Sequence, residues 1–132
     1  VEEGIVPGGG LALLRARESL DSLTLEGDEQ TGINILRAAL VKPLMLISEN
    51  TGVSGEVILA ETLKGDGDYG YDAETGEYGN LLEQGIMDPA KVTRAAIENA
   101  SSVAAMVLTT ESLISDIPQP EPAAPAMPPM DY

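Results

Sequence analysis

Three consecutive glycines, Gly8, Gly9 and Gly10, stand directly before a segment with helical spacing. At the start of a helix the backbone amides are free, and the absence of side chains lets a negatively charged group approach closely. This arrangement is typical of anion-binding loops. It is equally typical of an ordinary turn from a loop into a helix, so the glycines alone leave both interpretations open.

A second candidate is the acidic turn formed by Asp72, Ala73 and Glu74. It lies within residues 66–80, where tyrosines flank the turn-prone sequence Glu-Thr-Gly and predict a small β-hairpin. From composition alone, a solvated acidic turn without a ligand is the simpler interpretation.

Asp88 and Pro89 together predict the start of a long helix. Aspartate is a favoured N-cap residue because its carboxylate accepts hydrogen bonds from free backbone amides, and proline is favoured at the first helical position. From this start the apolar spacing predicts a helix to about Ile114, followed by a short strand at 115–117. We therefore expect Asp88 to cap this helix, a role worth about 1 kcal/mol.

The sequence lacks the residues that several other common chemistries need. The sequence contains no His and no Cys, which removes the usual neutral-pH general base and the commonest zinc ligands. Asp66, Asp68 and Glu77 fall at positions 1, 3 and 12 of an EF-hand-like loop, but Tyr71 occupies position 6, where such a loop needs glycine. We expect no metal ligand and no catalytic residue in this chain.

The composition also excludes several partners. The 132 residues include 22 acidic and 7 basic side chains, and the net charge of −15 repels nucleic acids and anionic lipid. No apolar run approaches the roughly 18 residues of a membrane span, and no signal peptide is visible. Because 43% of the residues are hydrophobic but only 3% are aromatic, we expect a core of packed aliphatic helices.

Hydrophobic spacing predicts the remaining elements. A helix begins at Leu11, an acidic connector follows at 24–31, and a second helix covers 32–50. Apolar residues surround most of the second helix, so we expect it to be deeply buried, with a kink at Pro43. A third helix is predicted over 54–63.

These elements predict an all-α, multihelical fold with a small β-hairpin. No internal repeat is evident, and residues 1–117 are expected to form one domain. Residues 118–132 are rich in Pro, Ala and Met and are expected to form a disordered tail.

Four segments match, in order, the pattern of one protein family. They are VEEGIVPGGGLALLR at the start, LRAALVKPLMLISENTG at 36–52, GDYGYDAETGEYGNLLEQGIMDPAKVTR at 67–94 and ASSVAAMVLTTESLISDIP at 100–118. Through them the chain resembles the bacterial-type (group I, GroEL family) chaperonins over about residues 1–118. The third segment is the most specific, because it is similar, nearly residue for residue, to the family's nucleotide-contacting hairpin and the helix after it.

This resemblance implies the C-terminal half of a chaperonin equatorial domain, the domain that binds ATP. The family uses ATP to assist the folding and refolding of other proteins, in a cytoplasmic double heptameric ring of identical subunits capped by a co-chaperonin. Its phosphate loop, its magnesium site and the aspartate that activates the attacking water belong to a part of the subunit that precedes the matched segments. We therefore expect no ATPase activity from this chain alone, and we expect unfolded protein substrates to bind other domains.

Five residues correspond to family positions around the ATP: Gly9, Asp72, Ala73, Glu74 and Asp88. The resemblance implies that Gly9 lies against the nucleotide, that the acidic turn borders the adenine, and that Asp88 accepts hydrogen bonds from the ribose hydroxyls. Position 72 is Asn in some family members, and an ionised Asp can only accept hydrogen bonds, whereas Asn can also donate them. The alternative is a nucleotide-independent helical scaffold or oligomerisation module with the same fold.

Overall fold

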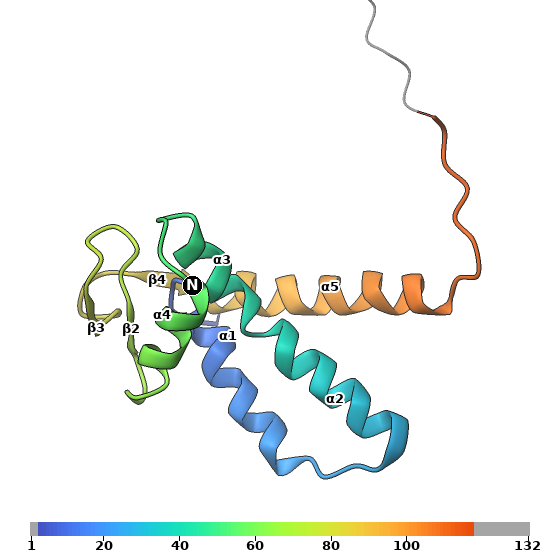
Figure 1. The fold of residues 1–132 in the computed structure, drawn as a ribbon, viewed down its shortest axis with the longest axis horizontal. Helices are drawn as coiled ribbons and strands as arrows, with labels where there is room; N and C mark the ends of the chain where they lie inside the picture. Colours follow the sequence, from blue (N-terminus) through green and yellow to red (C-terminus); the bar gives the residue numbers. More distant parts are fainter. Residues whose placement is uncertain (1–2, 118–132) are drawn as a thin grey trace, which may run out of the picture.

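The computed structural model describes residues 3–117 and is mostly helical, with two small antiparallel sheets (Figure 1). This confirms the predicted fold class. The predicted hairpin is present and pairs β2 (Tyr69–Tyr71) with β3 (Tyr78–Asn80). The other sheet was not predicted: β1 (Ile5–Pro7) pairs with β4 (Met87–Pro89), which joins segments far apart in the sequence. The predicted tail at 118–132 lies outside the described residues.

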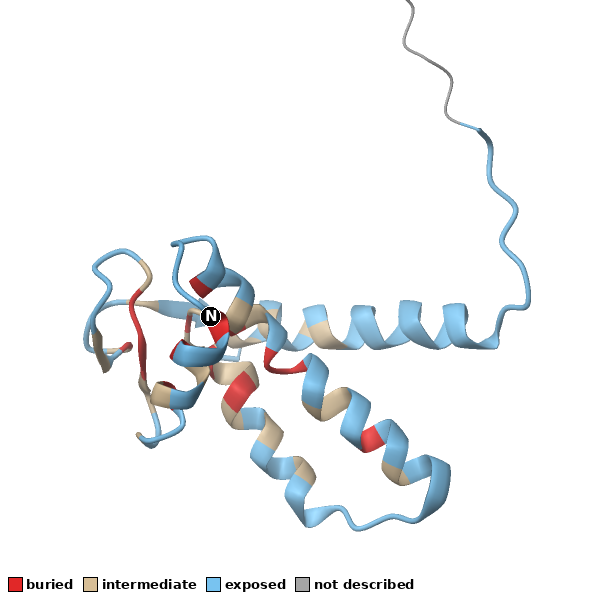
Figure 2. Ribbon diagram, in the orientation of Figure 1, coloured by how far each residue is buried: buried red, intermediate tan, exposed pale blue. Residues whose placement is uncertain are grey.

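One hydrophobic cluster packs together the hairpin, α1 (Leu11–Ala16), α3 (Lys42–Glu49) and α4 (Gly55–Thr62). Its buried members are Leu11, Leu14, Val41, Leu44, Ile58, Tyr71 and Leu81. Figure 2 shows most buried positions at the end of the molecule that carries the hairpin, while α5 (Ala90–Thr109) extends away from it with no buried residue. The core therefore fixes the hairpin relative to the start of α1.

The first helix begins at Leu11 as predicted and tightens into a 3-10 helix, η1 (Arg17–Ser22). The acidic connector is shorter than predicted, because α2 spans Gly27–Ala39 and includes Asp28 and Glu29 in its first turn. Acidic side chains suit this position, since the N-terminus of a helix carries a partial positive charge. Part of the acidic stretch at 24–31 is therefore the start of a helix.

The single kinked helix predicted over 32–50 is instead two helices. α2 ends at Ala39 and α3 begins at Lys42, with Pro43 in its first turn. A continuous helix would need an amide hydrogen from Pro43 for the Ala39 carbonyl, and proline has none, whereas the first turn of a new helix does not require it. The chain therefore breaks before this proline.

The deep burial expected for this region is also wrong for the described chain. Ile35 is 65% exposed and Leu46 is 57% exposed, whereas Ile33 and Leu44 are buried. By length and composition alone, Gly27–Glu49 is long and apolar enough to cross a membrane, so the prediction that no such stretch exists was wrong. Core helices pass the same test, however, and the break between α2 and α3 interrupts this stretch.

The last two helices differ in how well they were predicted. α4 agrees with its predicted range to within one residue at each end. α5 has Pro89 at its N-cap and no side-chain capping bond, because Asp88 lies in β4 and pairs there with Val6. The predicted capping role of Asp88 is therefore wrong.

α5 also ends earlier than the predicted Ile114, and no strand forms at 115–117. At its end the Thr109 hydroxyl donates to the Ala105 carbonyl at 2.9 Å, and the Thr110 hydroxyl donates to the Met106 carbonyl at 2.5 Å. Side-chain bonds of this kind compete with the backbone amides that would extend the helix. Apolar spacing alone does not register this competition, so it overestimated the length.

Candidate functional site

The glycine loop, residues Gly8–Gly10, lies against β4. The Gly8 amide donates to the Ile86 carbonyl at 3.0 Å, which continues the β1–β4 ladder beyond the strands. A Cβ on Gly8 would lie 3.2 Å from the Ile86 side chain and 3.3 Å from the Met87 amide nitrogen. Because the register pairs Val6 with Asp88, the loop and Asp88 are attached to the same small sheet.

Gly9 and Gly10 face different neighbours. Gly9 has a φ of +64°, and a Cβ there would lie 3.8 Å from the Tyr71 carbonyl oxygen, one residue before Asp72. Gly10 has a φ of +79°, and a Cβ there would lie only 2.6 Å from the Leu44 amide nitrogen. Gly10 therefore allows the loop to pack on α3, while Gly9 brings it beside the hairpin.

The Asp72 side chain is part of the hairpin turn. One carboxylate oxygen accepts a hydrogen bond from the Glu74 amide at 2.8 Å, and the other accepts one from the Thr75 hydroxyl at 2.7 Å. The hydrogen bond from Thr75, followed by that from the Glu74 amide, holds the pKa of the Asp72 carboxyl below its usual range, although burial opposes this. Asp72 is 8% exposed, and both of its carboxylate oxygens accept hydrogen bonds from its own turn.

The turn backbone is closed by two further hydrogen bonds. The Asp72 amide donates to the Glu77 carbonyl, and the Gly76 amide donates to the Asp72 carbonyl, both at 2.9 Å. Ala73 is half-buried and packs against the core cluster, whereas Glu74 is exposed. The turn thus holds a small side chain at the edge of the core and an acidic one in solvent.

Asp88 is the opposite of Asp72 in its surroundings. It is exposed on β4, and its side chain makes no hydrogen bond or ion pair within residues 3–117. An ionised carboxylate offers about four lone-pair positions, so this one can accept two donors from a ligand. Of the two aspartates, Asp88 has the carboxylate that is open to a new partner.

The structure brings the predicted residues together in part. Gly9 meets the residue before Asp72, and Asp88 joins the same loop through the β1–β4 sheet. Sequence reasoning did not single out Gly70, where a Cβ would lie 2.8 Å from Leu81 Cδ1 and would push the hairpin off the core. A glycine between two tyrosines in a predicted strand was the available signal. Sequence reasoning also passed over Arg15, whose side chain lies beside the segment that leads into the hairpin.

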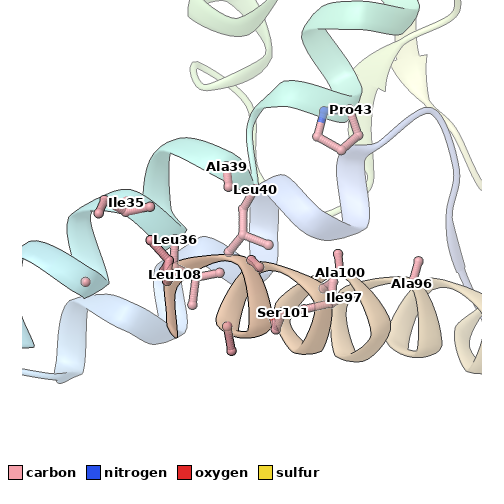
Figure 3. Close-up of a pocket in the computed structure, with 13 residues that line it drawn as sticks. Ile35, Leu36, Ala39, Leu40, Pro43, Ala96, Ile97, Ala100, Ser101 and Leu108 are labelled. Atoms are coloured by element: carbon pink, nitrogen blue, oxygen red, sulfur yellow. The ribbon is translucent and has the colours of Figure 1, made fainter. Parts of the chain in front are cut away.

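A hollow of the described surface lies away from these residues. A groove of about 580 Å³ separates α2 and the start of α3 from α5, and Figure 3 shows aliphatic side chains lining it from both sides. Ile35, Leu36 and Leu40 face Ile97, Ala100 and Leu108 across it. None of the five predicted site residues lines this groove, and its walls offer little polar chemistry. It is therefore a separate feature from the glycine loop and the hairpin.

The hairpin region does not gather metal ligands. Within residues 3–117 there is no group of three or more His, Cys, Asp or Glu side chains that could hold a metal ion. The EF-hand-like spacing of Asp66, Asp68 and Glu77 therefore does not produce a cluster in the fold.

Fold and site together define a mostly helical protein in which a glycine loop, an acidic hairpin turn and an aspartate-bearing strand meet at one end. A protein-family model of the TCP-1/cpn60 chaperonin family matches residues 1–118. The match covers most of the chain, and the chain belongs to this family. Membership gives it a chaperonin-type role in protein folding and assembly with like subunits.

Proposed function

We propose that this chain is part of a bacterial-type, ATP-dependent chaperonin subunit and supplies the adenosine side of its ATP pocket. The observation that carries the proposal is the meeting of the glycine loop with the hairpin and β4, two segments that lie far later in the sequence. Gly9 lies against the Tyr71 carbonyl at the hairpin, and the same loop continues the sheet that contains Asp88. These are the segments to which the family resemblance assigns the nucleotide contacts.

In this proposal the three segments divide the nucleoside between them. Gly9 forms a wall without a side chain, so the nucleotide can approach the backbone closely. Ala73 and Glu74 border the adenine, and Asp88 accepts hydrogen bonds from the ribose hydroxyls. Asp72 acts mainly through the turn, since both of its carboxylate oxygens already accept hydrogen bonds there.

The wider proposal follows the family. The phosphates and a magnesium ion would be held by parts of the subunit outside this chain, so the chain alone would not hydrolyse ATP. The complete protein would be a cytoplasmic double heptameric ring that works with a co-chaperonin on unfolded proteins. This segment would add contacts between like subunits to its share of the pocket.

The sharpest test concerns Asp88 and uses a complete chaperonin subunit that contains this segment. We expect wild type to bind 2′-deoxy-ATP more weakly than ATP by on the order of 1.5–3 kcal/mol, the worth of a charge-assisted hydrogen bond. In Asp88→Asn this difference should shrink markedly, because the contact is already weakened. Since Asp88 does not cap α5, the substitution should leave thermal stability nearly unchanged. Calorimetric titration of wild type and Asp88→Asn with each of the two nucleotides gives the four affinities that this comparison needs.

Asp66→Asn is the matched control, because it removes the same charge from an exposed position ahead of the hairpin. It should leave the 2′-deoxy difference at its wild-type value. If the affinity difference between ATP and 2′-deoxy-ATP were equally large in wild type and Asp88→Asn, the ribose contact would be excluded. If the wild-type subunit bound no ATP at all, the nucleotide-independent scaffold would be the correct function.

A further inference from the structure

The guanidinium of Arg15 is surrounded by backbone carbonyl oxygens from the segment that leads into the hairpin. Its Nε donates to the Gly67 carbonyl at 2.9 Å. Its Nη2 lies 2.7 Å from the Gly65 carbonyl oxygen, 3.1 Å from that of Tyr69 and 3.3 Å from that of Thr62. The Arg15 side chain is 17% exposed, so these bonds are largely shielded from water.

These carbonyls come from three different kinds of structure. Thr62 is the last residue of α4, and carbonyls at a helix C-terminus have no partner within the helix and attract a cation. Tyr69 is the first residue of β2, where the neighbouring Asp68 carbonyl accepts the ladder bond from the Leu81 amide at 3.0 Å. Successive carbonyls of a strand point to opposite sides, so that of Tyr69 faces away from β3. One guanidinium therefore ties together a helix end, a loop and a strand.

Arg15 reaches this segment from α1, which begins directly after the glycine loop. Its only carboxylate contact in the described chain, to Glu18, spans 3.9 Å, so the carbonyls are its main partners. The side chain thus connects two of the three segments that meet at the proposed pocket. Lysine could not replace it, because a single ammonium group lacks the planar fork that reaches several carbonyls at once.

We propose that Arg15 is a positioning residue for the nucleoside pocket: it fixes the hairpin that carries Ala73 and Glu74 against the loop that carries Gly9. The inference rests on the proposed function for its link to nucleotide. The positioning itself is a property of the chain without ligand and can be measured separately.

The hairpin carries its own spectroscopic probe. The chain has four tyrosines and no Trp or Phe, and three of the tyrosines lie in β2 and β3. The Tyr69 and Tyr78 rings stack with centroids 6.1 Å apart, and the Tyr71 ring is 5.2 Å from that of Tyr78. Near-ultraviolet circular dichroism therefore reports on the order of this hairpin.

We expect Arg15→Ala and Arg15→Lys to lose most of the near-ultraviolet signal while the far-ultraviolet helix signal is kept. The Leu81 amide, which donates to Asp68, should exchange with solvent faster by on the order of ten- to a hundredfold, the factor that one charge-assisted hydrogen bond represents. Arg17→Ala is the matched control. Arg17 carries the same charge two residues later and makes no side-chain hydrogen bond or ion pair within residues 3–117, so this variant should behave as wild type.

Chemical rescue separates positioning from general loss of structure. Low millimolar guanidinium chloride should restore the tyrosine signal of Arg15→Ala, while the same concentration of sodium chloride should not. An unchanged tyrosine signal and unchanged Leu81 exchange in Arg15→Ala would overturn the proposal. So would a collapse of the helix signal in both Arg15 variants that guanidinium does not reverse.

The link to nucleotide is tested in the complete subunit, where Arg15→Ala should weaken ATP binding and guanidinium should restore it. If Arg15→Ala loosened the hairpin but left the ATP affinity unchanged, the proposal that Arg15 positions the nucleoside pocket would be wrong. If wild type failed to bind ATP, the proposed function would fail, while the tyrosine and exchange results would still decide whether Arg15 orders the hairpin.

Discussion

The glycine loop and the hairpin are held on a core of buried leucines, whereas α5 leaves the same fold with none of its residues buried (Figure 2). Leu81, directly after β3, is 1% exposed, and Leu108, near the end of α5, is 85% exposed. Both segments match the chaperonin family, so membership alone does not predict which apolar residues are covered in this chain. What differs is the connection: α5 is anchored by β4 at one end, while the hairpin is packed against three helices.

The largest test of this contrast compares the same substitution in both regions. Leu81→Ala should lower the free energy of unfolding by about 2–5 kcal/mol, because it leaves a cavity in the core. Leu108→Ala should change it by no more than about 0.5 kcal/mol, since the side chain lies in solvent. Urea unfolding followed by far-ultraviolet circular dichroism, with sedimentation to verify a monomer, gives both values. Equal losses would mean that α5 is covered in solution.

The second test concerns the glycine loop. Gly10→Ala places a Cβ 2.6 Å from the Leu44 amide nitrogen and also forces alanine to a φ of +79°. The φ costs about 1–2 kcal/mol, and the overlap adds about 1–3 kcal/mol. Gly52→Ala is the control, because its φ is +82° but nothing lies within 4 Å of the new Cβ. Thermal unfolding that showed the same loss for both variants would contradict the close packing of the loop on α3.

The smallest expected effect is a loss of stability of the hairpin turn in acid. The folded-state pKa of Asp72 lies below its usual range, so the stabilisation from its ionised carboxylate is complete above about pH 4 and is lost as the pH falls through the folded-state pKa. Tyrosine circular dichroism should therefore decline in acid, and Asp72→Asn should make this decline shallower. Asp68→Asn, whose native side chain makes no hydrogen bond within residues 3–117, should titrate like wild type. An identical acid profile for Asp72→Asn would show that the turn does not depend on the charge.

Local signals predicted the local structure. Tyrosines around a Glu-Thr-Gly turn predicted the hairpin, and helical spacing predicted α4 to within a residue at each end. The β1–β4 sheet could not be predicted in this way, because three-residue strands far apart in the sequence carry no periodic pattern. The missing signal for this sheet also explains the error at Asp88. An Asp-Pro pair predicts a helix cap, but the pairing with Val6 places Asp88 in a strand.

The candidate site was predicted by resemblance more than by residue chemistry. Gly9 and the acidic turn each had a plain structural interpretation, and only the family pattern joined them. The inward direction of the Asp72 carboxylate depends on the Thr75 hydroxyl and the turn backbone, which sequence spacing does not fix. Arg15 was missed because its partners are backbone carbonyls, and these leave no trace in side-chain identity.

The β1–β4 pairing also sets an order of folding. It joins Pro7 to Met87 and so closes a loop of about eighty residues, whereas the hairpin closes about seven, and the longer closure costs about 2 kcal/mol more in chain entropy. The hairpin can therefore form early and locally, and the anchor of α5 forms late. During synthesis β1 emerges before β4, and until β4 follows, the backbone groups that pair with it have no partner there. Its length of three residues, ending in Pro7, limits how far it can pair with another chain in that interval.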